Sequence, residues 1–119
     1  MLQNVRVASG GKVAWLEIGL ELRRKHQASA DDTQSFLNLL LLLKDAEVVC
    51  LFREDEPDHT RVSMKSKGKI IINKVAMEVG GGGHEFAAGC SLEGSFEKSV
   101  KSMIQKLSQT IDHYDRYGK

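Results

Sequence analysis

Residues 80–89 read Gly-Gly-Gly-Gly-His-Glu-Phe-Ala-Ala-Gly, and they hold five of the 11 glycines in the chain. Glycine can adopt positive φ angles and exposes its backbone N–H group. Successive N–H groups in such turns can form an anion-binding nest. His84 follows at once and can donate a hydrogen bond to a phosphate oxygen, while Ala87, Ala88 and Gly89 leave the adjacent surface free of bulk. We interpret this segment as a phosphate-binding loop; the alternative is a flexible connector.

Two common phosphate-binding motifs do not match this loop. No Lys-Ser or Lys-Thr pair follows the glycines, so the segment is not a P-loop. It follows a predicted helix rather than a strand and lacks the third glycine of the dinucleotide-binding fingerprint. The nest and His84 are therefore the features that point to phosphate here.

A basic segment lies just upstream of the glycines. Residues 61–74 carry five basic side chains and no acidic one, whereas residues 54–58 form a predicted acidic turn. The alternation in residues 61–66 predicts a strand on which Arg61, Ser63 and Lys65 share one face. Such a row of donors suits a polyphosphate or a nucleic-acid backbone. An ordinary solvated strand face is the alternative.

The rest of the pattern predicts an α/β (α+β) fold, a mixed β-sheet covered by helices, in a single compact domain. Asn73 and Ser95 are expected to cap the last two helices, and a Gly-Gly turn should join the first two strands. The expected strands are residues 5–7, 13–18, 46–52, 61–66 and 87–92, and the expected helices are residues 19–27, 31–44, 73–79 and the segment after Ser95.

Composition excludes several classes of protein. The 119 residues are 41% hydrophobic with a net charge of +1, which indicates one globular domain and gives no overall attraction to nucleic acid or membrane. Cys50 and Cys90 lack zinc-ligand spacing, so we expect buried, reduced thiols rather than a metal site or a disulfide. The N-terminus has no secretory pattern and the longest apolar run, residues 39–43, cannot span a bilayer. We therefore expect a cytoplasmic protein without membrane contact.

The helix expected at residues 31–44 contains a segment, residues 36–43, that is apolar on nearly every side. A helix of that kind is either buried or meets a partner. We therefore expect burial, and self-association into a homodimer if part of residues 39–43 is exposed.

Two segments, Ser63-Met64-Lys65-Ser66-Lys67-Gly68 and residues 80–89, together resemble the signature of the DHH-associated C-terminal domain of DHH-family phosphoesterases. That family includes RecJ-like exonucleases, nano-RNase and pAp-phosphatase enzymes, and cyclic-dinucleotide phosphodiesterases. The resemblance covers residues 48–111 and is specific in its glycine–histidine–Ala-Ala-Gly string. Lys65 stands where the family commonly has arginine, and lysine keeps the charge but loses the bidentate fork.

This resemblance implies a division of labour between two domains. An N-terminal catalytic domain, supplied in cis, would hold two manganese ions through an Asp-His-His motif, and this domain would bind the single-stranded oligonucleotide or nucleotide substrate. Carried onto this chain, Gly81, Gly82, Gly83 and His84 would line the substrate pocket, and Ser63 and Lys65 would contact phosphate. The chain itself would hold no catalytic residue, no metal and no cofactor.

The catalytic motif is absent from the sequence. Residues 58–60 and 112–114 contain an Asp-His pair each but no Asp-His-His, and neither lies where a two-metal site needs it. We expect residues 1–119 to be a fragment of a larger manganese-dependent phosphoesterase that is not catalytic alone. The alternatives are a non-catalytic nucleic-acid-binding module, as in the related C-terminal domain of alanyl-tRNA synthetases, and a dimerisation domain.

Overall fold

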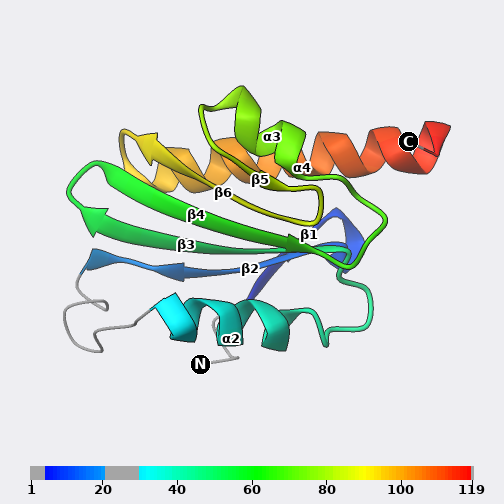
Figure 1. Cartoon of the computed structure of the whole chain (residues 1–119), viewed down its shortest axis with the longest axis horizontal. Coiled ribbons are helices and arrows are strands. Elements are labelled where there is room, and N and C mark those ends of the chain that lie inside the picture. Colours follow the sequence, from blue (N-terminus) through cyan, green and yellow to red (C-terminus); the bar gives the residue numbers. More distant parts are fainter. Residues whose placement is uncertain (1–4, 21–29, 119) are drawn as a thin grey trace.

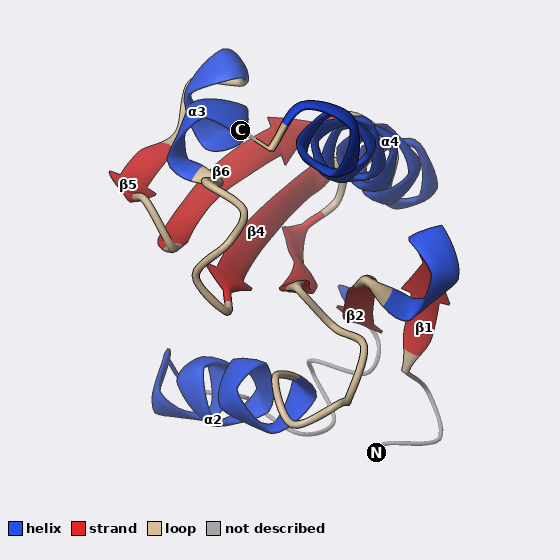
Figure 2. Cartoon of the chain, turned by 90° about the vertical axis from the view of Figure 1, so that its right-hand side faces the viewer, coloured by secondary structure: helices blue, strands red, loops and turns tan. Residues whose placement is uncertain are grey.

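A computed structural model describes residues 5–20 and 30–118 and has three layers. A central sheet is covered on one face by α2 and on the other by α3 and α4 (Figures 1 and 2). The predicted mixed sheet covered by helices is confirmed. The helices are α2 (Ala30–Leu40), α3 (Asn73–Glu78) and α4 (Phe96–Tyr117).

The sheet has six strands in the order β1-β2-β3-β4-β6-β5. The pair β2–β3 is parallel and every other pair is antiparallel. The expected hairpin is present, because β1 and β2 pair antiparallel across a short 3-10 turn at Ser9–Gly11. The strands are β1 (Arg6–Ala8), β2 (Val13–Ile18), β3 (Val48–Glu56), β4 (His59–Ser66), β5 (Gly82–His84) and β6 (Ala87–Glu93).

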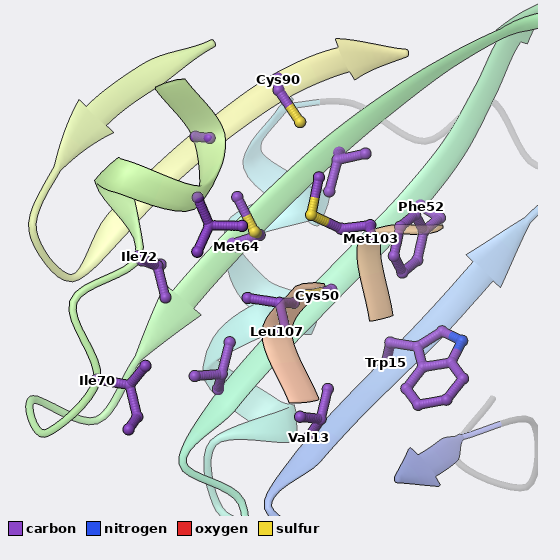
Figure 3. Close-up of a cluster of buried hydrophobic side chains, with 14 of the residues drawn as sticks. Val13, Trp15, Cys50, Phe52, Met64, Ile70, Ile72, Cys90, Met103 and Leu107 are labelled. Atoms are coloured by element: carbon purple, nitrogen blue, oxygen red, sulfur yellow. The ribbon is translucent and has the colours of Figure 1, made fainter. Parts of the chain in front are cut away.

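The larger hydrophobic core lies between the sheet and the helices α3 and α4 (Figure 3). Met103, Leu107 and Ile111 follow helical spacing on α4 and are all buried against the sheet. From β4, Val62 and Met64 point into the same core. Ser95 caps α4 as expected, since its side chain accepts a hydrogen bond from the Lys98 N–H at 3.2 Å.

A smaller core lies on the opposite face, where α2 packs on β2 and β3. Its members include Leu37 and Leu40 from α2 together with Val49 and Leu51 from β3. No residue of β4, β5 or β6 belongs to this cluster. On this face, therefore, α2 packs on β2 and β3 and reaches β4 at its edge, whereas no residue of β5 or β6 takes part in this core.

The apolar segment at residues 36–43 is only partly buried, which corrects the expectation of burial and meets the condition stated for self-association. The helix ends at Leu40 instead of residue 44. Leu37 and Leu40 are buried, whereas Leu39 and Leu43 are exposed and Leu42 is 79% exposed. A helix lying on a flat sheet buries one stripe of side chains, so Leu39 on the opposite stripe stays in solvent. Leu42 and Leu43 lie in the turn after the helix.

Two other expectations were wrong, and a third lies outside the described residues. Glu54–Glu56 continue β3 rather than forming an acidic turn, and the turn itself is Pro57–Asp58, with Asp58 at φ 60. Ile72, not Asn73, is the N-cap of α3 and gives no side-chain cap. The helix expected at residues 19–27 falls almost entirely outside the described residues. None of the described helices is both long and apolar enough to cross a membrane.

Both cysteines are free and buried, as expected. Cys50 lies on β3 and Cys90 on β6, and β4 runs between these two strands. Burial raises the pKa of Cys90 to about 11 and raises the pKa of Cys50 further. Both are therefore thiols at neutral pH, and they act as small apolar side chains of the core.

A hydrogen bond beside the β3–β4 turn should make the stability of the fold depend on pH. His59 Nδ1 lies 2.5 Å from Asp55 Oδ1, and this hydrogen bond, helped by the charges of Glu56 and Glu93, raises the pKa of His59 above its ordinary value of 6.5. A raised pKa means that the stabilisation is complete below pH 6.5 and is lost as the pH rises through the folded-state value. Thermal unfolding between pH 5.5 and 8.5 should show the wild-type advantage over His59→Gln shrinking with rising pH. Parallel curves for the two proteins would contradict this.

Candidate substrate-binding site

Beside α2, on the same face of the sheet, the strands β4, β6 and β5 present one continuous strip of side chains, which we call the open strip. Antiparallel partners point to the same face of a sheet, so the register of β4, β6 and β5 places them in rows. Lys65, Ala87 and His84 form one row, Ser63, Gly89 and Gly82 form the next, and Arg61 and Ser91 form the third.

Lys65 and His84 stand on either side of Ala87. With two strand spacings between them, their backbones lie about 10 Å apart. The methyl group of Ala87 is the only side chain between them in this row, and both Ala87 and His84 are exposed. A phosphate or sugar over Ala87 would therefore have an ammonium on one side and an imidazole on the other.

Lys65 is held by the helix that borders the open strip. Its Nζ donates a hydrogen bond to Asn38 Oδ1 on α2 at 2.8 Å. Lys67 ties down the chain after the same helix, since its Nζ donates to the Leu43 carbonyl at 2.9 Å. These two contacts fasten the end of α2 to the end of β4, so α2 forms one wall of the strip.

The β5–β6 turn at residues 85–86 forms the lower end of the strip and is fixed by backbone hydrogen bonds. Ser66 N–H donates to the Phe86 carbonyl at 2.8 Å, and Ile72 N–H donates to the Glu85 carbonyl at 2.8 Å. A pocket of about 510 Å³ opens there and includes Lys65 and His84 in its lining. Asn73 also lines it and carries a buried Oδ1 with no hydrogen-bond partner.

The four glycines do not form a nest, and this corrects the expectation of a phosphate-binding loop. Gly82 and Gly83 belong to the edge strand β5, in which successive N–H groups point in opposite directions. Gly80 and Gly81 close α3 instead: Gly80 N–H donates to Met77 and Gly81 N–H to Ala76, with Gly80 at φ 85. This is the Schellman arrangement of a helix C-terminus.

Gly81 and Gly83 leave no room for a side chain, whereas Gly82 does. A Cβ on Gly81 would lie 2.3 Å from the Gly89 carbonyl oxygen, and a Cβ on Gly83 would lie 2.6 Å from Ala88 Cα. Gly82 has no atom within 4 Å of the Cβ position and no positive φ. Its backbone is therefore accessible on the open strip, and a small side chain would fit there. Ala88 also departs from expectation, because it packs against the larger core and not beside the strip.

The structure thus brings together four of the six residues predicted for the site. Ser63, Lys65, Gly82 and His84 lie on the open strip, while Gly81 and Gly83 shape the backbone behind it. Sequence reasoning missed Asn38. Its signal was present, because it is the single polar side chain within the apolar residues 36–43.

The described residues outside the strip contain a second pocket but no cluster of metal ligands. A second pocket of about 730 Å³ lies between α3 and α4, on the other face of the sheet, and includes none of the six predicted residues. Across residues 5–20 and 33–118, no group of three or more His, Cys, Asp or Glu side chains is placed to hold a metal ion.

Comparison with known proteins gives matches across nearly the whole chain. The family model described as the DHHA1 domain matches residues 10–113. The bifunctional oligoribonuclease and PAP phosphatase NrnA of Thermus thermophilus is 27% identical over 84 residues, which cover 66% of this chain and 26% of that protein. The chain therefore spans about a quarter of this relative's length.

Two solved structures share the fold. An exopolyphosphatase-related protein from Bacteroides fragilis has a TM-score of 0.78 at 30% identity, with 95% of this chain and 32% of that chain covered. The C-Ala domain of alanyl-tRNA synthetase from Aquifex aeolicus has a TM-score of 0.57 at 17% identity, with 81% of this chain and 90% of that one covered. At 17% identity, the similarity to the C-Ala domain concerns the fold alone.

The glycine contacts predict unequal tolerance to a methyl group. Gly81→Ala should destabilise the fold by about 1–3 kcal/mol, because the added Cβ meets backbone and Cys90. Gly82→Ala is the matched control and should change stability by less than about 0.5 kcal/mol, since its site is open. Urea unfolding of both variants measures the difference. Equal stability of the two variants would mean that β5 does not pack on β6 as described.

Proposed function

The chain belongs to the DHHA1 domain family, and from this premise we propose that it is the substrate-binding domain of a metal-dependent DHH phosphoesterase that acts on short oligonucleotides or small nucleotides. One observation carries the proposal: the row formed by Lys65, Ala87 and His84 beside α2, in which Ala87 and His84 are exposed. A cation and an imidazole facing each other over a small residue suit a phosphate and its attached sugar.

The relative with a stated activity supports the same substrate class. The Thermus protein is described as an oligoribonuclease and PAP phosphatase, and both activities concern phosphate esters of nucleotides. For this chain the charged and polar side chains of the open strip offer the matching chemistry. Lys65 supplies a point charge, Ser63 a hydroxyl and His84 a directional donor.

Manganese belongs, in this proposal, to a separate catalytic domain. A two-metal centre needs several convergent carboxylates and histidines, and the described residues do not fit it, because no such group of three is present among them. We therefore assign no reaction step to this chain. Its role is to bind the substrate's phosphates and present them to a catalytic domain joined in cis.

We propose two further properties on separate grounds. The unpaired thiols Cys50 and Cys90 favour a reducing compartment, and therefore the cytoplasm.

Three leucines after the middle of α2 are exposed: Leu39, Leu42 and Leu43. Exposed apolar side chains favour contact with another surface, and we propose that this surface is a second copy of the chain in a homodimer.

Removal of His84 should weaken nucleotide binding. A hydrogen bond to a charged group contributes about 1.5–3 kcal/mol, so His84→Ala should lower the affinity for a 5′-phosphorylated dinucleotide by about ten- to a hundredfold. Lys65→Ala should cost less, and its effect should shrink as salt rises. Calorimetric titration of the 119-residue chain measures both. His113→Ala, on α4, is the control and should bind like wild type; unchanged affinity in His84→Ala would refute the site.

The pure chain should not hydrolyse a labelled dinucleotide, with or without manganese. The physical reason is that no cluster of metal ligands exists in its described part. Separation of the products by electrophoresis would reveal any cleavage. Turnover that persists at constant specific activity through a further purification step would contradict the division of labour.

A further inference from the structure

The open strip continues one row beyond the residues assigned above. Arg61 lies on the same face of β4 as Ser63 and Lys65, and its partner across β6 is Ser91. Alternate residues of a strand are spaced by about 6.6–6.8 Å. This is comparable to the spacing of successive phosphates along an extended nucleic-acid strand, so the three rows repeat at the period of such a backbone.

Arg61 is available to a ligand. Its side chain is exposed, and among the described residues it has no hydrogen-bond or ion-pair partner. Ser91 is also exposed and is small, so no bulky side chain stands next to Arg61 on the β6 side. A guanidinium presents a planar fork of N–H donors that matches two phosphate oxygens, which lysine cannot do.

The strip ends after Arg61. The next row consists of His59 and Glu93, and His59 is already bonded to Asp55. Glu56 lies opposite His59 on β3. These carboxylates repel a further phosphate. At the other end, past Lys65, the β5–β6 turn closes the strip, and Lys67 is engaged with the chain after α2.

We infer that Arg61 and Ser91 form a third backbone-binding position, which takes the third phosphate of a single-stranded oligonucleotide. This inference rests on the proposed function and makes it more specific. The strip then accommodates three phosphates between Lys65 and Arg61, over about 13 Å. The preferred ligand is a 5′-phosphorylated trinucleotide rather than a mononucleotide or a long strand.

The test compares 5′-phosphorylated di-, tri- and tetraribonucleotides on the 119-residue chain. Wild type should bind the trinucleotide about tenfold more tightly than the dinucleotide, and the tetranucleotide should add less than about threefold. Arg61→Gln should remove the gain from the third nucleotide and leave dinucleotide affinity within about twofold. Arg61→Lys should retain part of the gain through its charge. Arg116→Gln, at the far end of α4, is the charge-matched control and should change neither affinity.

Two further measurements test whether the third phosphate binds at Arg61 and Ser91. The slope of log affinity against log salt should be steeper by about 0.7 for the trinucleotide than for the dinucleotide in wild type, and this difference should vanish in Arg61→Gln. In amide NMR spectra of the labelled chain, Ser91 should shift with the trinucleotide but not with the dinucleotide. Equal losses for both ligands in Arg61→Gln, or no loss for either, would overturn the third position.

Failure of this inference is distinguishable from failure of the proposed function. If His84→Ala weakens dinucleotide binding while Arg61→Gln does not discriminate between the two lengths, only the third position is wrong. If wild type binds none of the three oligonucleotides, the proposed function and this inference fall together.

Discussion

The register of β4 between β3 and β6 is the constraint on which the fold and the site both depend. Val62 and Met64 are almost fully buried beneath α3 and α4, and their burial fixes which face of the strand points inward. Because side chains alternate, the same constraint turns Ser63 and Lys65 outward. A slip of one residue would place Lys65 in the core and Met64 in solvent. The site residues are thus oriented by apolar neighbours that never touch a ligand.

The helices cover the two faces of the sheet to different extents, and this leaves the outward-facing side chains of β4 accessible to a ligand. One face is packed along its length by α3 and α4, whereas α2 packs on β2 and β3 of the opposite face. The hydrogen bond of Lys65 to Asn38 shows that α2 reaches β4. Beyond it, β6 contributes Ala87, Gly89 and Ser91, and these small side chains leave the backbone approachable. Small residues on this face of β6 allow a flat, extended ligand to lie close to the strand.

The glycine-rich segment shows how one composition can serve several structural purposes. Gly80 ends α3 in the left-handed conformation, Gly81 and Gly83 pass too close to β6 for a side chain, and Gly82 lies on the open strip. A run of four glycines predicts conformational freedom, yet here it forms the end of a helix and an edge strand. The interpretation as an anion nest failed because pairing with β6 orders the segment, and pairing is not visible in local sequence.

The periodicity of apolar residues was sufficient to predict the features that depend on residues close in sequence. The alternation of residues 61–66 correctly predicted the faces of β4, helical spacing predicted the buried stripe of α4, and Ser95 was recognised as its cap. The quoted motifs also led to the family that the comparison shows. These inferences succeeded because they need only the geometry of one strand or one helix.

Tertiary structure alone decided which of these elements meet. Lys65 and His84 are nineteen positions apart in sequence, and only the pairing of β4, β6 and β5 places them in one row. The leucine-rich helix could not reveal which leucines it buries, because that depends on the flat surface against which it packs. Long-range pairing and one-sided packing are properties of the assembled sheet, so the site exists only once the strands are paired.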